Sequence, residues 1–331
     1  MRFKSLVVTE KPGKIFERKI IHRETDDLPA GEVLIRVHYS SLNYKDALSA
    51  TGNKGITRNF PHTPGIDAAG IVEQSSNGLF RSGDEVVITG YDLGMNTSGG
   101  FGQYIRVPAS WIIKKPLSLS LKQCMIIGTA GFTAATAVYK MQLLGVSPCQ
   151  LPIVVSGATG GVGSFAVAIL TKAGYTVTAI TGKKNATEYL EFLGASQIKE
   201  RDFLHDQSGK PLIKSQWAGG IDTVGGRTLE TMLKGCAIEG GIVSTGLVDS
   251  PLLSLTVYPF ILNGVSLLGV GSAGMSMPQR LKIWDRLAGE WNVQSKLGEI
   301  GKEVTLEEVN DHYIDEILQG KIKGRILVSL L

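Results

Sequence analysis

The sequence predicts an α/β protein in which a β-rich N-terminal part precedes a parallel, doubly wound sheet. Up to about Leu117, short strand-like runs are separated by Gly, Pro, Asn and Asp, whereas after Lys122 apolar runs alternate with helical patterns. The chain has 331 residues, which suits roughly two domains at about 150 residues each. Together these observations predict two domains of different architecture.

The N-terminal strands are predicted from alternating apolar and polar residues bounded by turn residues. They cover residues 5–9, 32–39, 68–74, 85–89 and 102–107. In the second part, strands at 153–155, 176–180, 220–223 and 241–245 alternate with helices at 162–172, 186–193 and 228–234. Such alternation is typical of parallel strands joined by crossover helices.

The C-terminal tail contains helical patterns at 279–291 and 306–318 and a last strand at 325–331. We expect the tail to rejoin the N-terminal domain. The predicted division is therefore a first domain of residues 1–123, rejoined by residues 273–331, and a second domain of residues 124–272.

Composition excludes several classes of protein. Apolar residues make up 43% and charged residues 19%, which is typical of a globular chain rather than a disordered one. The net charge of +4 is spread thinly, so we expect no nucleic-acid partner. The three cysteines, Cys124, Cys149 and Cys236, are too few and too far apart for a disulfide framework, and a cytoplasmic location is expected.

An uncharged stretch lies between Asp249 and Arg280 and raises the question of a membrane span. Proline, asparagine and glycine interrupt it, so we expect no membrane association and predict buried strand pieces at Val257, 260–262 and 266–270. An apolar edge strand tends to pair with a second copy, and residues 252–271 therefore predict a homodimer.

A glycine-rich turn carries the strongest chemical signal. The strand ending at Ser156 is followed by Gly-Ala-Thr-Gly-Gly-Val-Gly and then by an apolar helix. Aligned on G-x-G-x-x-G, Ala158 takes the first glycine position, while Gly160 and Gly163 take the second and third. The alternative is a tight strand-to-helix turn without a ligand. We predict a dinucleotide site with contacts from Thr159, Gly160, Gly161, Val162 and Gly163.

The end of the next strand indicates which dinucleotide. An NAD site usually places Asp or Glu there for the ribose 2′-hydroxyl, whereas this chain has Thr181, Gly182, Lys183 and Lys184. A hydroxyl, an amide and two ammonium groups suit a 2′-phosphate, and the predicted cofactor is NADPH. Solvated turn lysines are the simpler alternative for Lys183 and Lys184.

Further motifs resemble the medium-chain dehydrogenase/reductase family. These motifs are Ser-Ser-Leu-Asn-Tyr-Lys-Asp at 40–46, Pro-Gly-Ile-Asp-Ala-Ala-Gly at 64–70, Gly-Asp-Glu-Val at 83–86 and Gly-Thr-Ala-Gly-Phe-Thr-Ala at 128–134. Asp-Thr-Val-Gly-Gly at 222–226, Tyr-Pro-Phe-Ile-Leu at 258–262 and Gly-Arg-Ile-Leu-Val at 324–328 resemble its acrylyl-CoA reductase group, which includes quinone oxidoreductase-like proteins. The resemblance implies a GroES-like catalytic domain followed by a Rossmann domain.

The zinc enzymes of this family use a Cys, a His-Glu pair and a second Cys around the catalytic metal. Here Ile66 stands in place of the His and Asp67 in place of the Glu, and no cysteine precedes Cys124. Because thiolate and imidazole ligands are missing, we expect no metal site. The chain also departs from the acrylyl-CoA reductase pattern at Asn263 and Gly271, which concerns substrate choice.

The resemblance also implies residue roles. Tyr44 would touch the cofactor and act as hydrogen-bond donor or acid, with Asn43 and Asp67 as further catalytic residues that orient it. Packing alone is the alternative for Tyr44, and pairing with an arginine such as Arg58 is the alternative for Asp67. Further cofactor contacts implied by the resemblance come from Thr133, Leu247, Ser272 and Arg325.

Three function classes remain from the sequence. The first is an NADPH-dependent reductase of the conjugated C=C bond of a small enoyl thioester, which would deliver hydride and then a proton. The second is a reductase of quinones, reactive enones or aldehydes. The third is a cofactor-bound interaction protein without turnover.

Overall fold

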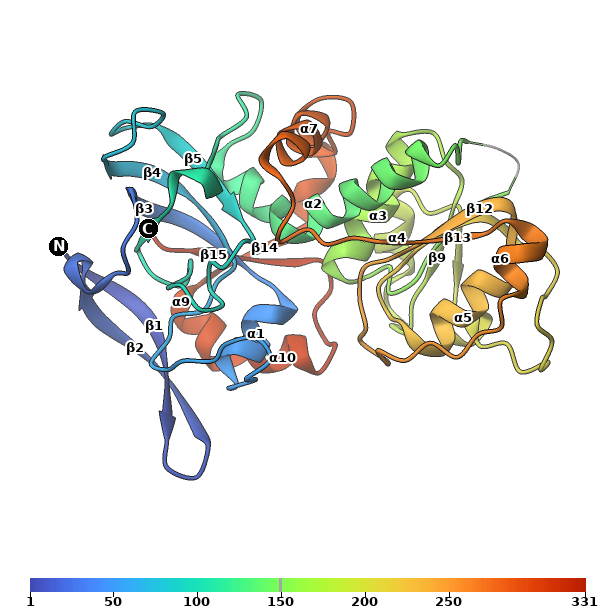
Figure 1. The fold of residues 1–331 in the computed structure, drawn as a ribbon, viewed down its shortest axis with the longest axis horizontal. Coiled ribbons are helices and arrows are strands. Elements are labelled where there is room, and N and C mark those ends of the chain that lie inside the picture. The colour runs from blue at the N-terminus through green and yellow to red at the C-terminus, as the bar shows by residue number, and fades with distance from the viewer. Residues whose placement is uncertain (149–150) are drawn as a thin grey trace. The chain divides into compact units, whose positions relative to one another are not determined.

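The computed structural model describes residues 1–148 and 151–331, so Cys149, one of the three cysteines not expected to form a disulfide framework, lies outside the described residues. The chain forms two compact units (Figure 1). Unit 1 comprises Met1–Thr129, Ala273–Trp284 and Ile300–Leu331; unit 2 comprises Ala130–Ser272 and Asp285–Glu299. The predicted α/β fold class is confirmed, because a parallel, doubly wound sheet and a separate β-rich sheet are both present.

Unit 1 is built on a seven-stranded sheet in the order β14-β15-β3-β4-β5-β7, with β6 also paired to β3, and on a separate β1–β2 hairpin. Its main core cluster includes Ile35, Leu42, Phe101 and Ile105. The last strand, β15, runs antiparallel to β3, with Ile326 opposite Leu42. The strands are β1 (Arg2–Lys11), β2 (Ile15–Glu24), β3 (Val33–Leu42), β4 (Asp67–Ser75), β5 (Glu85–Thr89), β6 (Tyr104–Val107), β7 (Ile113–Lys114), β14 (Gly301–Thr305) and β15 (Arg325–Ser329).

Unit 2 contains a six-stranded parallel sheet in the order β10-β9-β8-β11-β12-β13. The strand order reverses between β8 and β11, and in such sheets ligands bind beyond the carboxyl ends of the strands at that point. The strands are β8 (Ile153–Val155), β9 (Val177–Ile180), β10 (Gln197–Lys199), β11 (Trp217–Asp222), β12 (Cys236–Ser244) and β13 (Ser266–Gly269). The helices between them are α3 (Gly161–Lys172), α4 (Thr187–Leu193), α5 (Gly226–Lys234) and α6 (Tyr258–Asn263).

The remaining helices include two that the sequence patterns did not predict. These are α1 (Tyr44–Ala50) and α2 (Leu121–Leu143), the latter broken by non-helical geometry at Gly128. In the tail, α7 covers Met277–Ala288 and α8 covers Leu297–Ile300; the predicted helix at 306–318 is divided into α9 (Leu306–Glu308), a π-helical turn (Val309–Tyr313) and α10 (Ile314–Leu318).

The prediction for the uncharged stretch was wrong in part. Residues 260–262 belong to helix α6 rather than to a strand, and Val257, Ile261 and Leu262 are 62%, 67% and 60% exposed. Residues 266–269 do form a strand, but β13 is the edge of its sheet and Leu267 is exposed. The exposed apolar side chains of this stretch therefore lie on α6, just before it and on the edge strand β13, while Leu268 of the same strand is half-buried. Among the described residues, no helix is long and apolar enough to cross a membrane.

Candidate cofactor site and buried polar network

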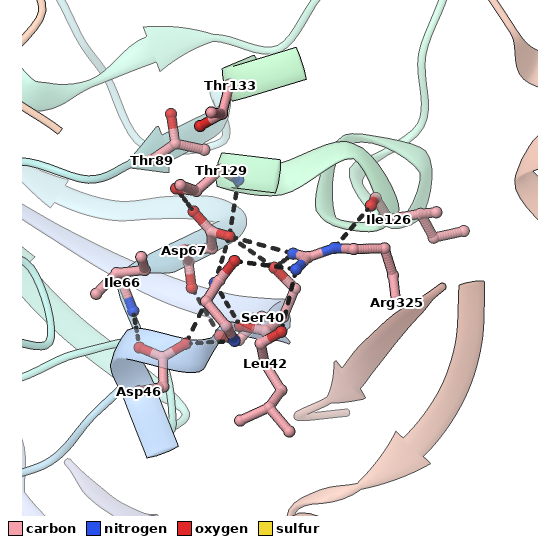
Figure 2. A network of polar contacts seen from close by, with 12 residues as sticks. Ser40, Leu42, Asp46, Ile66, Asp67, Thr89, Ile126, Thr129, Thr133 and Arg325 are labelled. Atoms are coloured by element: carbon pink, nitrogen blue, oxygen red, sulfur yellow. Dashed lines mark hydrogen bonds and ion pairs between the residues drawn. The ribbon is translucent and has the colours of Figure 1, made fainter. Parts of the chain in front are cut away.

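A buried carboxylate, Asp67, collects hydrogen bonds from three segments of unit 1 (Figure 2). Its Oδ2 accepts from Ser41 Oγ at 2.7 Å, Asn43 Nδ2 at 2.9 Å and the Thr129 amide at 2.9 Å. Its Oδ1 accepts from Thr129 Oγ1 at 2.6 Å. Asp67 begins β4, and the sheet register brings that strand end beside β3 and the start of β15. Four hydrogen bonds from neutral donors thus hold the carboxylate, in addition to any ion pair.

The cation of this network is Arg325, which is 3% exposed. Its Nη2 lies 3.4 Å from Asp67 Oδ2 and 2.6 Å from Ser41 Oγ. Its Nη1 donates to the Leu42 carbonyl and to Asn43 Oδ1, and its Nε donates to the Ile126 carbonyl. Burial lowers the pKa of Arg325, and the charges of Asp67 and Asp46 oppose that shift. All three nitrogens of the guanidinium are therefore engaged inside unit 1.

The network corrects one hypothesis about Asp67. The carboxylate is paired with an arginine, as the packing interpretation supposed, but Arg58 is exposed and the partner is Arg325. The two residues are far apart in sequence and become neighbours only through the pairing of β15 with β3. A contact of Arg325 with the cofactor stays a prediction.

Asn43 connects this polar network to helix α1. Its main-chain N–H donates to Asp46 Oδ2 at 2.8 Å, which closes the first turn of the helix. Asp46 Oδ1 in turn accepts from the Ile66 amide at 2.8 Å. Burial and the charge of Asp67 raise the pKa of Asp46 to about 7. Tyr44 is the first residue of this helix, so the network fixes its backbone position. The tyrosine itself is 40% exposed.

Gly128 interrupts helix α2 beside the Asp67 carboxylate. Gly128 has φ 47° and ψ −157°, which interrupts the helix immediately before Thr129. A Cβ at Gly128 would lie 2.6 Å from Asp67 Oδ2 and 2.7 Å from Arg325 Nη2. Both the backbone angle and the lack of space require glycine there. The break allows Thr129 to donate its amide and its hydroxyl to Asp67.

In unit 2, the glycine-rich turn has the geometry that a phosphate requires. A Cβ at Gly163 would lie 2.3 Å from the Gly157 carbonyl, so this glycine permits the tight packing of helix on turn. At Gly160 the nearest atom to a Cβ would be 3.4 Å away, and the surface of the turn is open. Gly160 is the N-cap of α3, a helix of 12 residues with no acid in its first turn. The free amides and the positive end of the helix dipole suit a pyrophosphate.

The end of β9 presents the residues predicted for a 2′-phosphate. Thr181 is nearly buried; its Oγ1 lies 3.3 Å from Thr159 Oγ1 and accepts from the Lys183 amide at 3.1 Å. Lys183 is half-buried and Lys184 is exposed. The structure thus brings the end of β9 together with the glycine turn.

Sequence reasoning missed one cation at this strand end. A Cβ at Gly182 would lie only 2.2 Å from Arg201 Nε, so the exposed Arg201 side chain rests against the glycine. Arg201 follows β10, which pairs in parallel with β9 at Lys199 and Ile180. The short strand at 197–199 was not predicted, and without it the sequence gives no reason to place Arg201 beside Gly182.

The remaining predicted cofactor residues of unit 2 are Thr133 in α2, Leu247 after β12 and Ser272 after β13. Thr133 in α2 donates to Ser272 Oγ at 3.0 Å. Leu247 follows β12 and is 62% exposed. Their contact with a cofactor stays a prediction.

Comparison with known proteins identifies the family. Two family models match, the alcohol dehydrogenase GroES-like domain over residues 29–117 and the zinc-binding dehydrogenase model over residues 161–286. Acrylyl-CoA reductase AcuI of Ruegeria pomeroyi is 40% identical over 330 residues, covering 99% of each chain. The chain belongs to the medium-chain dehydrogenase/reductase family. The resemblance seen in the motifs is therefore confirmed.

Other relatives in this family are as similar. YhfP of Bacillus subtilis, provisionally named as a quinone oxidoreductase, is 44% identical over 306 residues, which is 92% of each chain. The crystal structure of the YhdH oxidoreductase from Salmonella enterica with NADP has a TM-score of 0.95 at 40% identity and covers 100% of both chains. The YhfP structure, with NAD bound, has a TM-score of 0.96 at 41% identity with the same coverage.

One of the matching family models is that of zinc-binding dehydrogenases, but the donor groups of this medium-chain dehydrogenase/reductase do not fit zinc. Ile66 offers a buried alkyl side chain, and the lone pairs of Asp67 already accept from protein donors. Burial raises the pKa of the Cys124 and Cys236 thiols to about 12, which keeps both protonated. Within residues 1–148 and 151–331, no three His, Cys, Asp or Glu side chains form a group that could hold a metal ion.

Proposed function

We propose that this protein is an NADPH-dependent oxidoreductase that reduces the conjugated C=C bond of a small enoyl thioester resembling acryloyl-CoA, without zinc. The observation that carries the cofactor part is the end of β9, where Thr181, Gly182, Lys183 and Arg201 offer hydrogen bonds and positive charge and no carboxylate stands. The relatives crystallised with NADP support this choice.

The residues of unit 2 would hold the cofactor in two places. The amides of the glycine turn at 160–163 would bind the pyrophosphate, and the Thr181 hydroxyl, the Gly182 amide and the nearby cations would bind the 2′-phosphate. When bound, NADPH supplies the hydride. The protein must then stabilise the negative charge that develops on the thioester oxygen and deliver a proton to the α carbon.

We assign the stabilisation of this charge and the delivery of the proton to Tyr44. Its position at the start of α1 is fixed through Asn43, which bonds to both Asp67 and Arg325. The phenol is partly exposed while its supporting residues are buried, an arrangement that leaves one polar group available to a substrate. Asn43, Asp67 and Arg325 act in this proposal as positioning residues for the helix start.

A quinone is the second candidate substrate, and the 44% identity with YhfP favours it. Quinones and enones both accept hydride at a conjugated position, so the same cofactor site serves either. They differ in the proton step, because the oxygens of a reduced quinone take protons directly from water.

Single-turnover oxidation of bound NADPH tests the proposal. Acryloyl-CoA, crotonoyl-CoA and a benzoquinone are mixed in parallel with the NADPH-loaded protein, and cofactor absorbance is followed. We expect the two thioesters to oxidise NADPH faster than the quinone does. Faster reaction with the quinone transfers the proposal to the second candidate, and no oxidation by any of the three refutes both.

The cofactor assignment has its own test in Arg201. Arg201→Ala is expected to weaken NADPH binding about 10- to 100-fold and to leave NADH binding unchanged, because a charge-assisted bond to phosphate contributes about 1.5 to 3 kcal/mol. Arg58→Ala, also an exposed arginine, serves as the control. An equal loss for both cofactors would remove Arg201 from the 2′-phosphate site.

A further inference from the structure

A second buried carboxylate, Asp222, lies at the end of β11 and has no part in the proposed chemistry. Its Oδ1 accepts from Ser156 Oγ at 2.7 Å and from the Val224 amide at 3.1 Å, and its Oδ2 accepts from the Gly225 amide at 2.9 Å. Burial raises the pKa of Asp222, and these three hydrogen bonds oppose the shift. All three hydrogen bonds are donated to the carboxylate, and both of its oxygens accept at least one of them.

On one side, these bonds reach the glycine turn. Ser156 is the residue directly before Gly157, and its Oγ accepts from the Thr223 amide at 2.9 Å. Thr223 Oγ1 donates back to the Ser156 carbonyl at 3.0 Å. Gly157 has φ +56°, and a Cβ there would lie 2.2 Å from Thr223 Oγ1. The first residue of the turn is thereby packed directly against the residue that follows Asp222.

On the other side, the same residues hold the segment after β12. The Asp222 carbonyl accepts from both the amide and the hydroxyl of Thr245, each at 2.8 Å. The Asp249 amide donates to the Val224 carbonyl at 2.9 Å. A Cβ at Gly246 would lie 2.3 Å from the Thr223 carbonyl. Leu247, a predicted cofactor contact, lies in this segment.

We propose that Asp222 is a positioning residue for dinucleotide binding: through Ser156 and residues 223–225 it sets the glycine turn and the 245–249 segment in one fixed arrangement. The inference rests on the proposed function. Asp222 would support binding of the pyrophosphate and not of the 2′-phosphate, because the side chains proposed to bind the 2′-phosphate follow β9 and β10.

Asp222→Asn tests this assignment with little change in volume. The amide group replaces one acceptor oxygen by a donor, which then faces either Ser156 Oγ and the Val224 N–H or the Gly225 N–H. Binding of NADPH and of 2′-AMP, which lacks the pyrophosphate, is measured by titration calorimetry. We expect NADPH to bind about 10- to 100-fold more weakly and 2′-AMP to stay within about threefold of the unaltered protein.

Two further variants complete the design. Ser156→Ala removes the link to Asp222 with a smaller change in the core and is expected to shift NADPH affinity in the same direction, which keeps the test available if Asp222→Asn does not fold. Tyr175→Phe is the control, since it removes a buried hydrogen bond to the Val146 carbonyl just before β9, at the amino end of that strand and away from its carboxyl end at Ile180. That variant is expected to lower the thermal midpoint and leave both affinities unchanged.

The affinity split separates positioning from general destabilisation. Equal weakening of NADPH and 2′-AMP in the Asp222 and Ser156 variants would overturn the inference, as would unchanged NADPH affinity in both. If the unaltered protein binds 2′-AMP and NADPH with equal strength, the pyrophosphate contributes nothing and the inference also fails. If it binds neither, the proposed function itself is refuted.

Discussion

Removing the buried cation at Arg325 should cost unit 1 much of its stability. Arg325→Met replaces a guanidinium that donates to Leu42, Ile126, Asn43 and Ser41 and that neutralises Asp67. Loss of one partner of a buried ion pair typically costs about 3 to 5 kcal/mol. Because Asp67 keeps three other donor residues, we expect about 3 kcal/mol, the lower end of that range.

The assay combines denaturant unfolding with hydrogen exchange. The unfolding midpoint is expected to fall, and the amides of α1 should exchange faster, since Asn43 loses one of its supports. Arg58→Met is the matched control, because Arg58 is exposed and its loss should change the free energy of unfolding by less than about 0.5 kcal/mol. Unchanged stability of Arg325→Met would refute the reasoning, and a tenfold loss of NADPH affinity would separately support the predicted cofactor contact of Arg325.

Four other outcomes are expected. Lys183→Ala combined with Lys184→Ala should weaken NADPH by about 2 kcal/mol and spare NADH in parallel titrations, and equal losses would contradict the 2′-phosphate assignment. Tyr44→Phe should lower kcat with an enoyl thioester by roughly 10² while NADPH affinity changes less than about tenfold and quinone turnover falls much less; an equal loss with both substrates would assign Tyr44 to packing. Because folding raises the pKa of Asp46 to about 7, the contribution of Asp46 to stability is greatest below its unfolded pKa and is lost as the pH rises through about 7. Asp46→Asn should abolish this part of the pH dependence when urea unfolding is compared at about pH 5 and about pH 8. An unaltered pH dependence in the variant would contradict the raised pKa. Light scattering at micromolar concentration should give twice the monomer mass through residues 252–271, and a monomeric mass would exclude the homodimer.

Site residues could be predicted from the sequence where residues that are close in the chain are also close in space. The glycine turn at 157–163 and the residues after β9 belong to short, continuous segments, and the structure places them at the ends of adjacent strands. The Asp67–Arg325 pair joins residues 258 positions apart, and only the pairing of β15 with β3 brings them together. Arg201 was missed for the same reason, because its place depends on the pairing of β10 with β9.

The uncharged stretch shows a different limit. Apolar composition predicts burial, but it does not distinguish a central strand from an edge. Ile261 and Leu262 lie in α6, which precedes the edge strand β13, and both are exposed within unit 2. Helix α2 was not predicted, and residues 128–134 entered the sequence analysis only as a family motif; in the structure Gly128 is a break inside a long helix.

The break at Gly128 also limits how this enzyme could be redesigned. Restoring a histidine at Ile66 and cysteines nearby would recreate the ligand types of a zinc alcohol dehydrogenase, yet the carboxylate at Asp67 would still be occupied by Thr129, whose amide is available only because the helix is broken. Side-chain replacement alone would leave that backbone donor in place. A metal-binding redesign of this chain would therefore have to change the backbone at Gly128 as well as the side chains around Asp67.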